Sequence, residues 1–236
     1  MTGHKTIFHS LLGSTLPPAE ITNERLNQEA ISVVVAGSAT TAMCLTRITF
    51  ELLACPTKLE KLCEELQSAE SDSYQLSLPQ LEQMSYLSCV VNEGLRLTYG
   101  TVHRLMRVSP DSAIQYKSWT IPAGTPVGMS SMFMHDNPRV FPDPRTFSPE
   151  RWLNPQERRT LERHLVPFSR GSRQCVGINL AYAEILLTLH ALFRPGGVGR
   201  KMKLFQTDID DIEIKHDFFN PFPKADSRGV RVLIEG

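Results

Sequence analysis

The sequence predicts a mainly α-helical protein with small β-sheets, an α+β class. Two long stretches, Thr22 to Ala54 and Gly177 to Phe193, carry apolar residues at helical spacing. Between and after them lie short runs of alternating polarity broken by prolines, which is typical of small strands and turns. Of the 236 residues, 41% are hydrophobic, so the chain can bury a sizeable core.

The first half of the chain is expected to form successive helices. The first begins near Thr22 and continues until the residues before Pro56. Pro56 suits the first turn of a second, amphipathic helix, TKLEKLCEELQSA, and a polar loop follows at residues 70–77. Pro79 then opens a third helical stretch, which runs on through YLSCVVNEGLRL.

From about Gly100 the pattern changes to short β-like pieces, namely VHRLMRV, SAIQY, SWTI and TPVGM. The stretch from His135 to Pro167 is rich in proline and charge, so we expect turns there. Three further strands are predicted in the tail, at KMKLFQT, IEIKH and GVRVLIE. The sequence shows no internal repeat and no clear domain boundary, and residues 1–236 are expected to form part of one domain.

The overall charge gives no reason to expect nucleic acid as a partner. Lys plus Arg and Asp plus Glu each number 25, so the net charge is zero and no long-range field attracts a polyanion. The N-terminus lacks the apolar core of a signal peptide. The best apolar run, at residues 30–46, is expected to be too short and too rich in Ser and Thr to span a bilayer. The chain is therefore predicted to be soluble.

The five cysteines are Cys44, Cys55, Cys63, Cys89 and Cys175. Because their number is odd and no CxxC pair occurs, the pattern argues against a disulfide framework and against a zinc site. Reduced thiols fit best.

One cysteine lies in an unusual setting, the segment FSRGSRQCVG at residues 168–177. Gly171 and Gly177 are expected to permit a backbone geometry or a close approach that a side chain would block. Cys175 comes just before an apolar helix and has Arg173 nearby, so the helix dipole and the cation favour thiolate over thiol. A thiolate is the form that binds a metal.

A lone cysteine before a helix is usually a small buried hydrophobe. Here, however, five fixed residue types occur within ten positions, and the pattern FxxGxRxCxG resembles the haem-binding signature of the cytochromes P-450. The resemblance implies that Cys175 is the axial ligand of haem iron and that its thiolate favours O–O cleavage. It also implies that Arg173 pairs with a haem propionate and that Phe168 packs beside the sulfur.

A second motif, Glu93-Gly-Leu-Arg96, places two opposite charges on one helical face. Alone it would most often be a solvated surface pair. It is similar to the family's ExxR motif, and the segment Pro149–Trp152, PERW, resembles the family's PERF-type motif. Arg151 can therefore complete a buried network with Glu93 and Arg96, and its role would be structural.

A third motif, AGSATT, interrupts the first long helix with a glycine and two threonines. Gly37 in a helix interior costs about 0.5–1 kcal/mol relative to alanine, and a broken local rule hints at function. Thr40 can bond back to the Ala36 carbonyl and open the helix. The alternative is a small-residue patch that lets another helix pack closely.

With the Cys175 segment present, AGSATT resembles the family's oxygen-binding motif, A/G-G-x-D/E-T-T. Thr40 then falls on the oxygen-facing threonine and Thr41 follows it. Ala39 stands where most members have Asp or Glu, a departure that puts the usual acid-assisted proton delivery in doubt. Arg107 aligns with a residue that often binds a haem propionate, the alternative being an exposed strand arginine.

The resemblance covers nearly the whole chain, from about Thr6, but only the second half of a family member. Two segments are similar to fungal-type members, MHDNPRVFPDPRTFSPERW and IKHDFFNPFPKADSRGVRVLI. Residues 1–236 would then be the C-terminal, haem-binding part of the P-450 fold, and the family's N-terminal half has no counterpart here. Full-length relatives are expected at the cytoplasmic face of the endoplasmic-reticulum membrane, whereas this chain shows no anchor.

Three functions follow from the resemblance. The first is a haem-thiolate monooxygenase that takes electrons from NADPH through a flavoprotein reductase and uses O2 to oxidise a small apolar substrate. The second is haem-thiolate isomerase, dehydratase or peroxygenase-like chemistry, which Ala39 makes possible. The third is a truncated, non-catalytic remnant. Bound haem separates the third from the others, and reductase-dependent turnover separates the first from the second.

Overall fold

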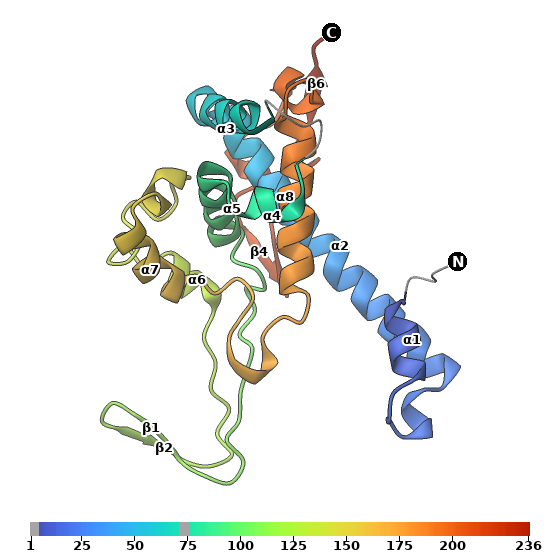
Figure 1. Ribbon diagram of the computed structural model, residues 1–236. Helices are drawn as coiled ribbons and strands as arrows, with labels where there is room; N and C mark the ends of the chain where they lie inside the picture. Colours follow the sequence, from blue (N-terminus) through green and yellow to red (C-terminus); the bar gives the residue numbers. More distant parts are fainter. Residues whose placement is uncertain (1–4, 71–75) are drawn as a thin grey trace. The chain divides into compact units, whose positions relative to one another are not determined.

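The computed structural model describes residues 5–70 and 76–236. The chain divides into two compact units, residues 1–42 and 43–236. The boundary lies inside one helix, α2 (Asn23–Ala54), which Figure 1 draws as a single element. No loop marks the division, so the sequence carries no compositional signal for it.

The first unit contains α1 (Ile7–Leu12), the 3-10 turn η1 (Pro18–Glu20) and the start of α2. The hydroxyl of Thr22 accepts a hydrogen bond from the Arg25 backbone N–H at 3.2 Å, which is the N-cap arrangement. The predicted start near Thr22 and the end before Pro56 are confirmed. The two shorter helices were not predicted, because neither is long enough to show an apolar period.

Helix α2 is relevant to the prediction that the chain cannot span a bilayer. With 32 residues, it is long and apolar enough to cross a membrane by length and composition. The prediction is therefore wrong on this criterion, since the helix extends beyond residues 30–46. Core helices of soluble proteins meet the same criterion, so the helix alone assigns no location.

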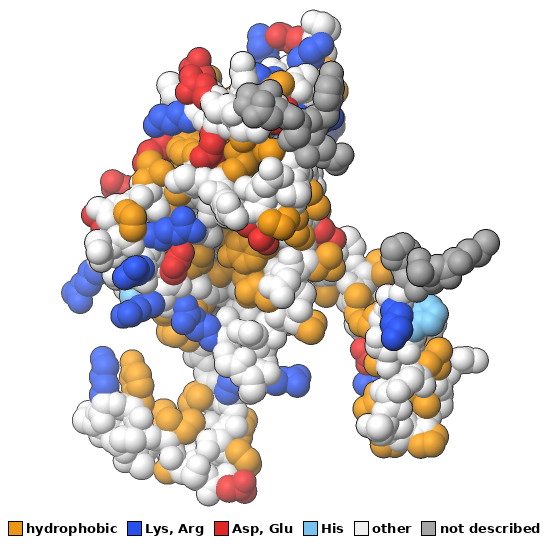
Figure 2. Space-filling view, viewed as in Figure 1, with side chains coloured by type: hydrophobic (Ala, Val, Ile, Leu, Met, Phe, Trp, Pro, Cys, Tyr) orange, Lys and Arg blue, Asp and Glu red, His pale blue; other side chains and the backbone are white. Residues whose placement is uncertain are grey.

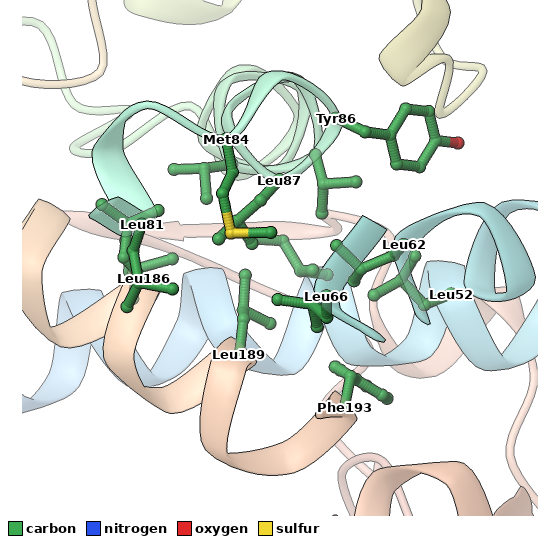
Figure 3. Close-up of a cluster of buried hydrophobic side chains, with 14 of the residues drawn as sticks. Leu52, Leu62, Leu66, Leu81, Met84, Tyr86, Leu87, Leu186, Leu189 and Phe193 are labelled. Atoms are coloured by element: carbon green, nitrogen blue, oxygen red, sulfur yellow. The ribbon is translucent and has the colours of Figure 1, made fainter. Parts of the chain in front are cut away.

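The second unit contains the rest of α2 and most of the helices in the chain. They are α3 (Pro56–Ala69), α4 (Leu78–Glu82), α5 (Ser85–Thr98), α6 (Ser131–His135), α7 (Pro155–His164) and α8 (Ile178–Phe193). Their apolar faces form the main core, in which each fully buried leucine contributes about 1.5–3 kcal/mol. Figure 3 shows members of this core: Leu52, Leu62, Leu66, Leu81, Leu87, Leu186, Leu189 and Phe193.

The single helical stretch predicted from Pro79 is in fact two helices, α4 and α5, separated at residues 83–84. The first turn of α5 is held from another helix. The Glu65 carboxylate of α3 accepts the backbone N–H groups of Tyr86 at 2.7 Å and Leu87 at 2.8 Å. The carboxylate thus pairs backbone N–H groups that have no partner within the first turn of a helix, and it belongs to a residue distant in sequence. Of the polar loop predicted at 70–77, residues 71–75 lie outside the described part of the chain.

The prediction of turns alone between His135 and Pro167 is wrong, because this stretch contains η3 (Pro149–Trp152) and the ten-residue helix α7. Asn154 caps α7, its side-chain oxygen accepting the Gln156 N–H at 2.9 Å, and Pro155 occupies the first helical position. The cap and the proline were both visible in the sequence. Their signal was obscured because α7 has few apolar residues.

The β-structure in the described residues consists of three two-stranded antiparallel pairs. They are β1 (Ile114–Tyr116) with β2 (Trp119–Ile121), β3 (Met202–Leu204) with β6 (Val232–Ile234), and β4 (His216–Phe218) with β5 (Asn220–Phe222). Short 3-10 turns lie at η4 (Gly171–Arg173), η5 (Val198–Lys201) and η6 (Ile209–Asp211). The helix-rich α+β class is confirmed.

Three of the predicted strands are not strands. Of IEIKH, residues 212–216, only His216 lies in a strand, β4, because the residues before it form a turn after η6. VHRLMRV and TPVGM meet only at one isolated bridge between Arg107 and Val127, with N–O distances of 2.7 and 2.8 Å. The pieces SAIQY and SWTI do pair, as β1 and β2, and Tyr116 stands opposite Trp119.

Candidate functional site

The segment that contains Gly171, Cys175 and Gly177, residues 166–177, forms a loop that we call the Cys loop. It closes on itself through three backbone hydrogen bonds, the first from the Ser169 N–H to the Val166 carbonyl at 3.1 Å. The Cys175 N–H donates to the Phe168 carbonyl at 2.9 Å, and the Gln174 N–H donates to the Gly171 carbonyl at 3.1 Å. Helix α8 begins directly after the loop, with Gly177 as its N-cap. The thiol of Cys175 is therefore held at a fixed point just before a helix.

Cys175 differs from the other cysteines in its exposure. All five thiols are free, but only Cys175 is exposed to solvent. Burial raises the pKa of Cys44 to about 12 and that of Cys89 to about 11, so both are unreactive thiols. Cys55 is half-buried, and a hydrogen bond with Thr57 lowers its pKa.

The two loop glycines behave differently. Gly171 has a φ of +81°, a conformation that favours glycine, as predicted. Gly177 has an ordinary φ of −87°, and a Cβ placed there would lie 3.8 Å from the Cys175 sulfur. This is a normal van der Waals distance, so the prediction that a side chain would be blocked at Gly177 is wrong.

The side chains around the loop divide into packed and exposed groups. Phe168 is half-buried and lies against Tyr182 of α8, with ring centroids 5.5 Å apart. Arg173, in η4, is exposed. Two apolar side chains near the loop end are also uncovered, Val176 at 101% and Leu180 at 57% exposure. A ligand bound at the Cys175 thiol would have these two apolar side chains available for contact.

Glu93 lies at the centre of a buried hydrogen-bond network. Its carboxylate accepts two bonds from the Arg96 guanidinium, at 2.8 and 2.9 Å, in a bidentate ion pair. It also accepts bonds from Arg151 Nε at 3.0 Å, from the Ser148 backbone N–H at 2.9 Å and from the Trp152 indole N–H at 2.9 Å. The Glu93 and Arg96 side chains are fully buried. The structure thus brings the three expected network residues together.

The two arginines carry the network into the proline-rich stretch. Arg96 donates to the carbonyls of His135, at 3.1 Å, and Pro144. Arg151 donates to the Pro142 carbonyl at 2.9 Å. These carbonyls lie in a segment without regular backbone pairing, where buried C=O groups need other partners. The network therefore fixes the path of the chain between α6 and α7.

The AGSATT motif lies in the first unit, on α2. The Thr40 hydroxyl donates to the Ala36 carbonyl at 2.7 Å, as expected. The helix nevertheless continues without interruption, so the predicted opening is wrong. A single back-bond is compatible with an intact helix because the carbonyl has a second lone pair. Ala39 is exposed, Thr41 is buried, and a Cβ at Gly37 would meet nothing within 4 Å.

Arg107 has an exposed side chain on the isolated bridge. Its guanidinium donates to the carbonyls of Met106 at 3.0 Å and Leu105 at 3.3 Å. The structure leaves this cation accessible to an anion in solvent.

Comparison with known proteins decides the family. The family model described as Cytochrome P450 matches residues 5–195. The chain belongs to the cytochrome P450 family. The match includes both α2 and the Cys loop, and thus every motif described above.

Individual P450 relatives are fungal. The chain is 44% identical over 235 residues to cytochrome P450 monooxygenase oblB of Aspergillus clavatus. It is 46% identical over 235 residues to N-acetyltryptophan 6-hydroxylase ivoC of Emericella nidulans, and 43% identical over 231 residues to tryptophan 6-hydroxylase fscE of Fusarium equiseti. These alignments cover 99%, 98% and 97% of this chain. They cover 45%, 45% and 44% of the relatives, so the chain spans less than half of their length.

The P450 family implies a haem cofactor, and the residues of this chain fit one. No cluster of three or more His, Cys, Asp or Glu side chains that could hold a bare metal ion occurs within residues 5–70 and 76–236. A metal centre relying on Cys175 alone must bring its remaining ligands with it, as a porphyrin does. An exposed thiol, exposed apolar side chains and exposed arginines are the donor, the apolar contacts and the cations that such a group needs.

Sequence reasoning missed three residues that contact the Glu93 network or the Cys loop. Trp152 binds the Glu93 carboxylate, Gly100 lies against the Cys loop, and His135 joins the loop to the network. Trp152 was within a motif that had been singled out, but its indole N–H had not been assigned a partner. Gly100 and His135 had no local signal, because both act on residues distant in sequence.

Proposed function

We propose that this chain is the haem-binding part of a monooxygenase that uses O2 to oxidise a small apolar organic substrate. Cys175 would be the axial ligand of the haem iron. The observation that carries the proposal is the exposed, free thiol of Cys175 at the end of a closed loop, in a chain that belongs to the P450 family. The names of the relatives, which are monooxygenases and hydroxylases, support the reaction class.

When bound, a haem would supply oxygen activation, which thiolate ligation favours by donating electron density toward the O–O bond. The residues of this chain would hold the Cys175 sulfur in a fixed position. The hydrogen bond from Cys175 N–H to the Phe168 carbonyl fixes the backbone on the loop side, and α8 fixes it on the other. Arg173 and Arg107 are exposed cations that would pair with the haem propionates.

Proton handling on α2 rests on hydroxyls. Ala39 has no proton to give, so the acid-assisted relay usual in P450 enzymes has no carboxylate here. The Thr40 hydroxyl donates its proton to the Ala36 carbonyl and keeps its lone pairs free to accept a hydrogen bond. We infer that Thr40 positions a water molecule by accepting a hydrogen bond from it, and that water carries the protons.

An electron donor would meet a basic surface. Figure 2 shows Lys and Arg side chains gathered over the face that carries α7, whose sequence includes Arg159 and Arg163, both exposed. The Cys loop adds exposed Arg170. A flavoprotein reductase with an acidic surface, fed by NADPH, would have the complementary charge and would be steered to this surface.

The substrate class can be narrowed by the relatives. Two of them are named as hydroxylases of tryptophan or N-acetyltryptophan, at 43% and 46% identity. Indole-containing amino acids are therefore the first substrates to test, together with apolar hydrocarbons for the more general reading.

Ala39 favours a second candidate function. A haem-thiolate isomerase, dehydratase or peroxygenase-like enzyme does not need protons delivered to bound O2 from a carboxylate, so the loss of that carboxylate would cost it nothing. A third possibility, a truncated chain that binds no haem, is distinguished by cofactor content alone.

The test is a carbon-monoxide difference spectrum of the purified, reduced chain after haem reconstitution. A thiolate-type band that disappears in Cys175→Ala supports the assignment. Product formation that requires both NADPH and a reductase supports the monooxygenase, whereas turnover with a peroxide or without any reductant supports the second candidate. A chain that takes up no haem under conditions in which it is folded contradicts both.

A further inference from the structure

His135 is the buried histidine that the proposed chemistry does not use. It is the last residue of α6, and its side chain has no solvent exposure. Its ring lies between Tyr99, which is stacked at a centroid distance of 5.8 Å, and Phe141, which meets it edge-on at 6.4 Å. Burial lowers the pKa of His135 to about 3, so the ring is neutral at physiological pH.

Both ring nitrogens have a partner, and the partners fix the tautomer. Nε2 lies 2.9 Å from the Val166 backbone N–H, which can only donate. Nε2 must therefore be the unprotonated acceptor. Nδ1 lies 2.9 Å from the Arg96 carbonyl, which can only accept, so Nδ1 carries the proton and donates it.

The two partners of His135 belong to the two structures described above, the Glu93 network and the Cys loop. Arg96 is the buried cation of the Glu93 network, and Val166 is the first residue of the Cys loop. Two residues after Val166, the Phe168 carbonyl accepts the Cys175 N–H. His135 is thus connected to the thiol-bearing residue through one short stretch of backbone.

A second contact holds the same stretch from the end of α5. Gly100 has a φ of +67°, and a Cβ placed there would lie 2.0 Å from the Pro167 carbonyl oxygen. The loop backbone therefore lies directly on the α5 terminus. Val166 and Pro167 both contact residues outside the loop. Val166 donates a hydrogen bond to His135, and Pro167 packs closely against Gly100.

We propose that His135 is a positioning residue for Cys175. As the neutral Nδ1–H tautomer it joins the Glu93–Arg96 network to the start of the Cys loop and thereby sets the position of the axial sulfur. The inference rests on the proposed function, because it assigns His135 to the support of a haem ligand. A histidine that only fills the core also needs partners for its ring nitrogens, but breaking those bonds would then change stability and leave the thiolate fraction unchanged.

Three substitutions separate these roles. His135→Gln places an amide oxygen near the Nε2 position and keeps an acceptor for the Val166 N–H. His135→Asn reaches only as far as Nδ1, so it keeps the Arg96 bond and loses the Val166 bond. His135→Phe keeps the ring and loses both bonds. Amide hydrogen exchange at Val166, the thermal melt, and the thiolate fraction of the carbon-monoxide difference spectrum are measured for each variant.

We expect Val166 exchange to rise by at least about tenfold in His135→Asn and His135→Phe, with a smaller thiolate fraction, and both to be largely restored in His135→Gln. If Asn and Phe variants that remain folded keep the parental exchange and thiolate fraction, the inference is wrong. A parent chain that binds haem without a thiolate spectrum would instead overturn the proposed function, and the inference with it.

A measurement on the parent chain covers the case in which a variant fails to fold. Long-range 15N–1H correlation spectra report which ring nitrogen of His135 is protonated. A neutral ring protonated at Nδ1, with Val166 slow to exchange, supports the inference. An Nε2–H tautomer or an imidazolium at neutral pH contradicts it, because neither can accept from Val166.

Discussion

Arg96 and His135 hold each other through two hydrogen bonds that run in opposite directions. The Arg96 guanidinium donates to the His135 carbonyl at 3.1 Å, and the His135 ring donates to the Arg96 carbonyl at 2.9 Å. Each carbonyl lies near the end of a helix, where backbone acceptors are left over, and that of Arg96 also accepts the Tyr99 backbone N–H at 3.3 Å. The backbone acceptors at the ends of α5 and α6 are therefore each paired by a side chain from the other helix. Arg96 also binds the buried Glu93 carboxylate, and His135 also binds the Cys loop.

The first prediction concerns the iron ligand. Cys175→Ala should abolish the thiolate-type carbon-monoxide spectrum, because no other exposed cysteine can replace it. Cys55→Ala is the matched control, since Cys55 is the other accessible cysteine and a hydrogen bond with Thr57 lowers its pKa. It should leave the spectrum unchanged. Loss of the band in Cys55→Ala but not in Cys175→Ala would show that the assignment is wrong.

The second prediction concerns the buried carboxylate. Glu93→Ala should lower the free energy of unfolding by about 3–5 kcal/mol, because it strands the buried Arg96 charge without its partner. Chemical denaturation of the chain measures the loss. Glu29→Ala removes an exposed ion pair with Arg25 and should change the same quantity by less than about 0.5 kcal/mol. Equal effects of the two substitutions would mean that the Glu93 pair is an ordinary surface pair.

The third prediction concerns the seat of the Cys loop. Gly100→Ala must strain a φ of +67° and also displace the Pro167 carbonyl, whereas Gly124→Ala at φ +78° meets nothing within 4 Å. The strain alone costs on the order of 1–3 kcal/mol. Gly100→Ala should therefore be clearly more destabilising, and it alone should lower haem occupancy. Two variants that melt together would argue against a close approach at Gly100.

The fourth prediction concerns acid sensitivity. The pKa of His135 is lowered by burial to about 3, well below that of an exposed histidine. The unfolded chain then binds more protons than the folded one below about pH 6.5, so stability is full above that pH and falls as the pH drops toward 3. Between pH 7 and 5 the loss should reach about 2 kcal/mol.

His135→Gln is the reference for this measurement, because glutamine does not titrate. Subtracting its stability profile from the parent's removes the groups common to both, including Glu51, whose pKa burial raises and which acts in the opposite direction. Parallel profiles in the parent and the variant would show that His135 is protonated equally in the folded and unfolded chains.

The fifth prediction concerns proton delivery on α2. Ala39→Asp should increase the fraction of NADPH that yields product, since it supplies a carboxylate next to the Thr40 hydroxyl. Ala39→Asn is similar in size but delivers no proton, so it should give no increase. Haem content is measured alongside to exclude effects on assembly. No gain in the Asp variant, with haem retained, would indicate another proton route or the second candidate function.

Much of the site was determined by short-range pattern. The Cys175 setting, the pairing of Glu93 with Arg96 across one helical turn, and the Thr22 cap of α2 all depend on residues close together in sequence. Spacing is enough to predict such features, because the backbone period fixes which side chains share a face. Arg151 was included in the predicted network with Glu93 and Arg96 only because its motif resembles one of a known family.

The tertiary structure decided what depends on distant partners. Glu65 begins α5 from a neighbouring helix, Gly100 receives the Pro167 carbonyl, and His135 bonds residues 39 positions before it and 31 after it. No local sequence pattern predicts these contacts, because a cap or an acceptor from elsewhere in the chain does not alter the sequence of the segment that it binds. Sequence alone thus singled out the Cys175 thiol, which is exposed, and the charged network of Glu93, which is buried. The contacts that position this thiol depend on the tertiary structure. Buried donors and acceptors must be paired, and in this chain their partners come from segments distant in sequence.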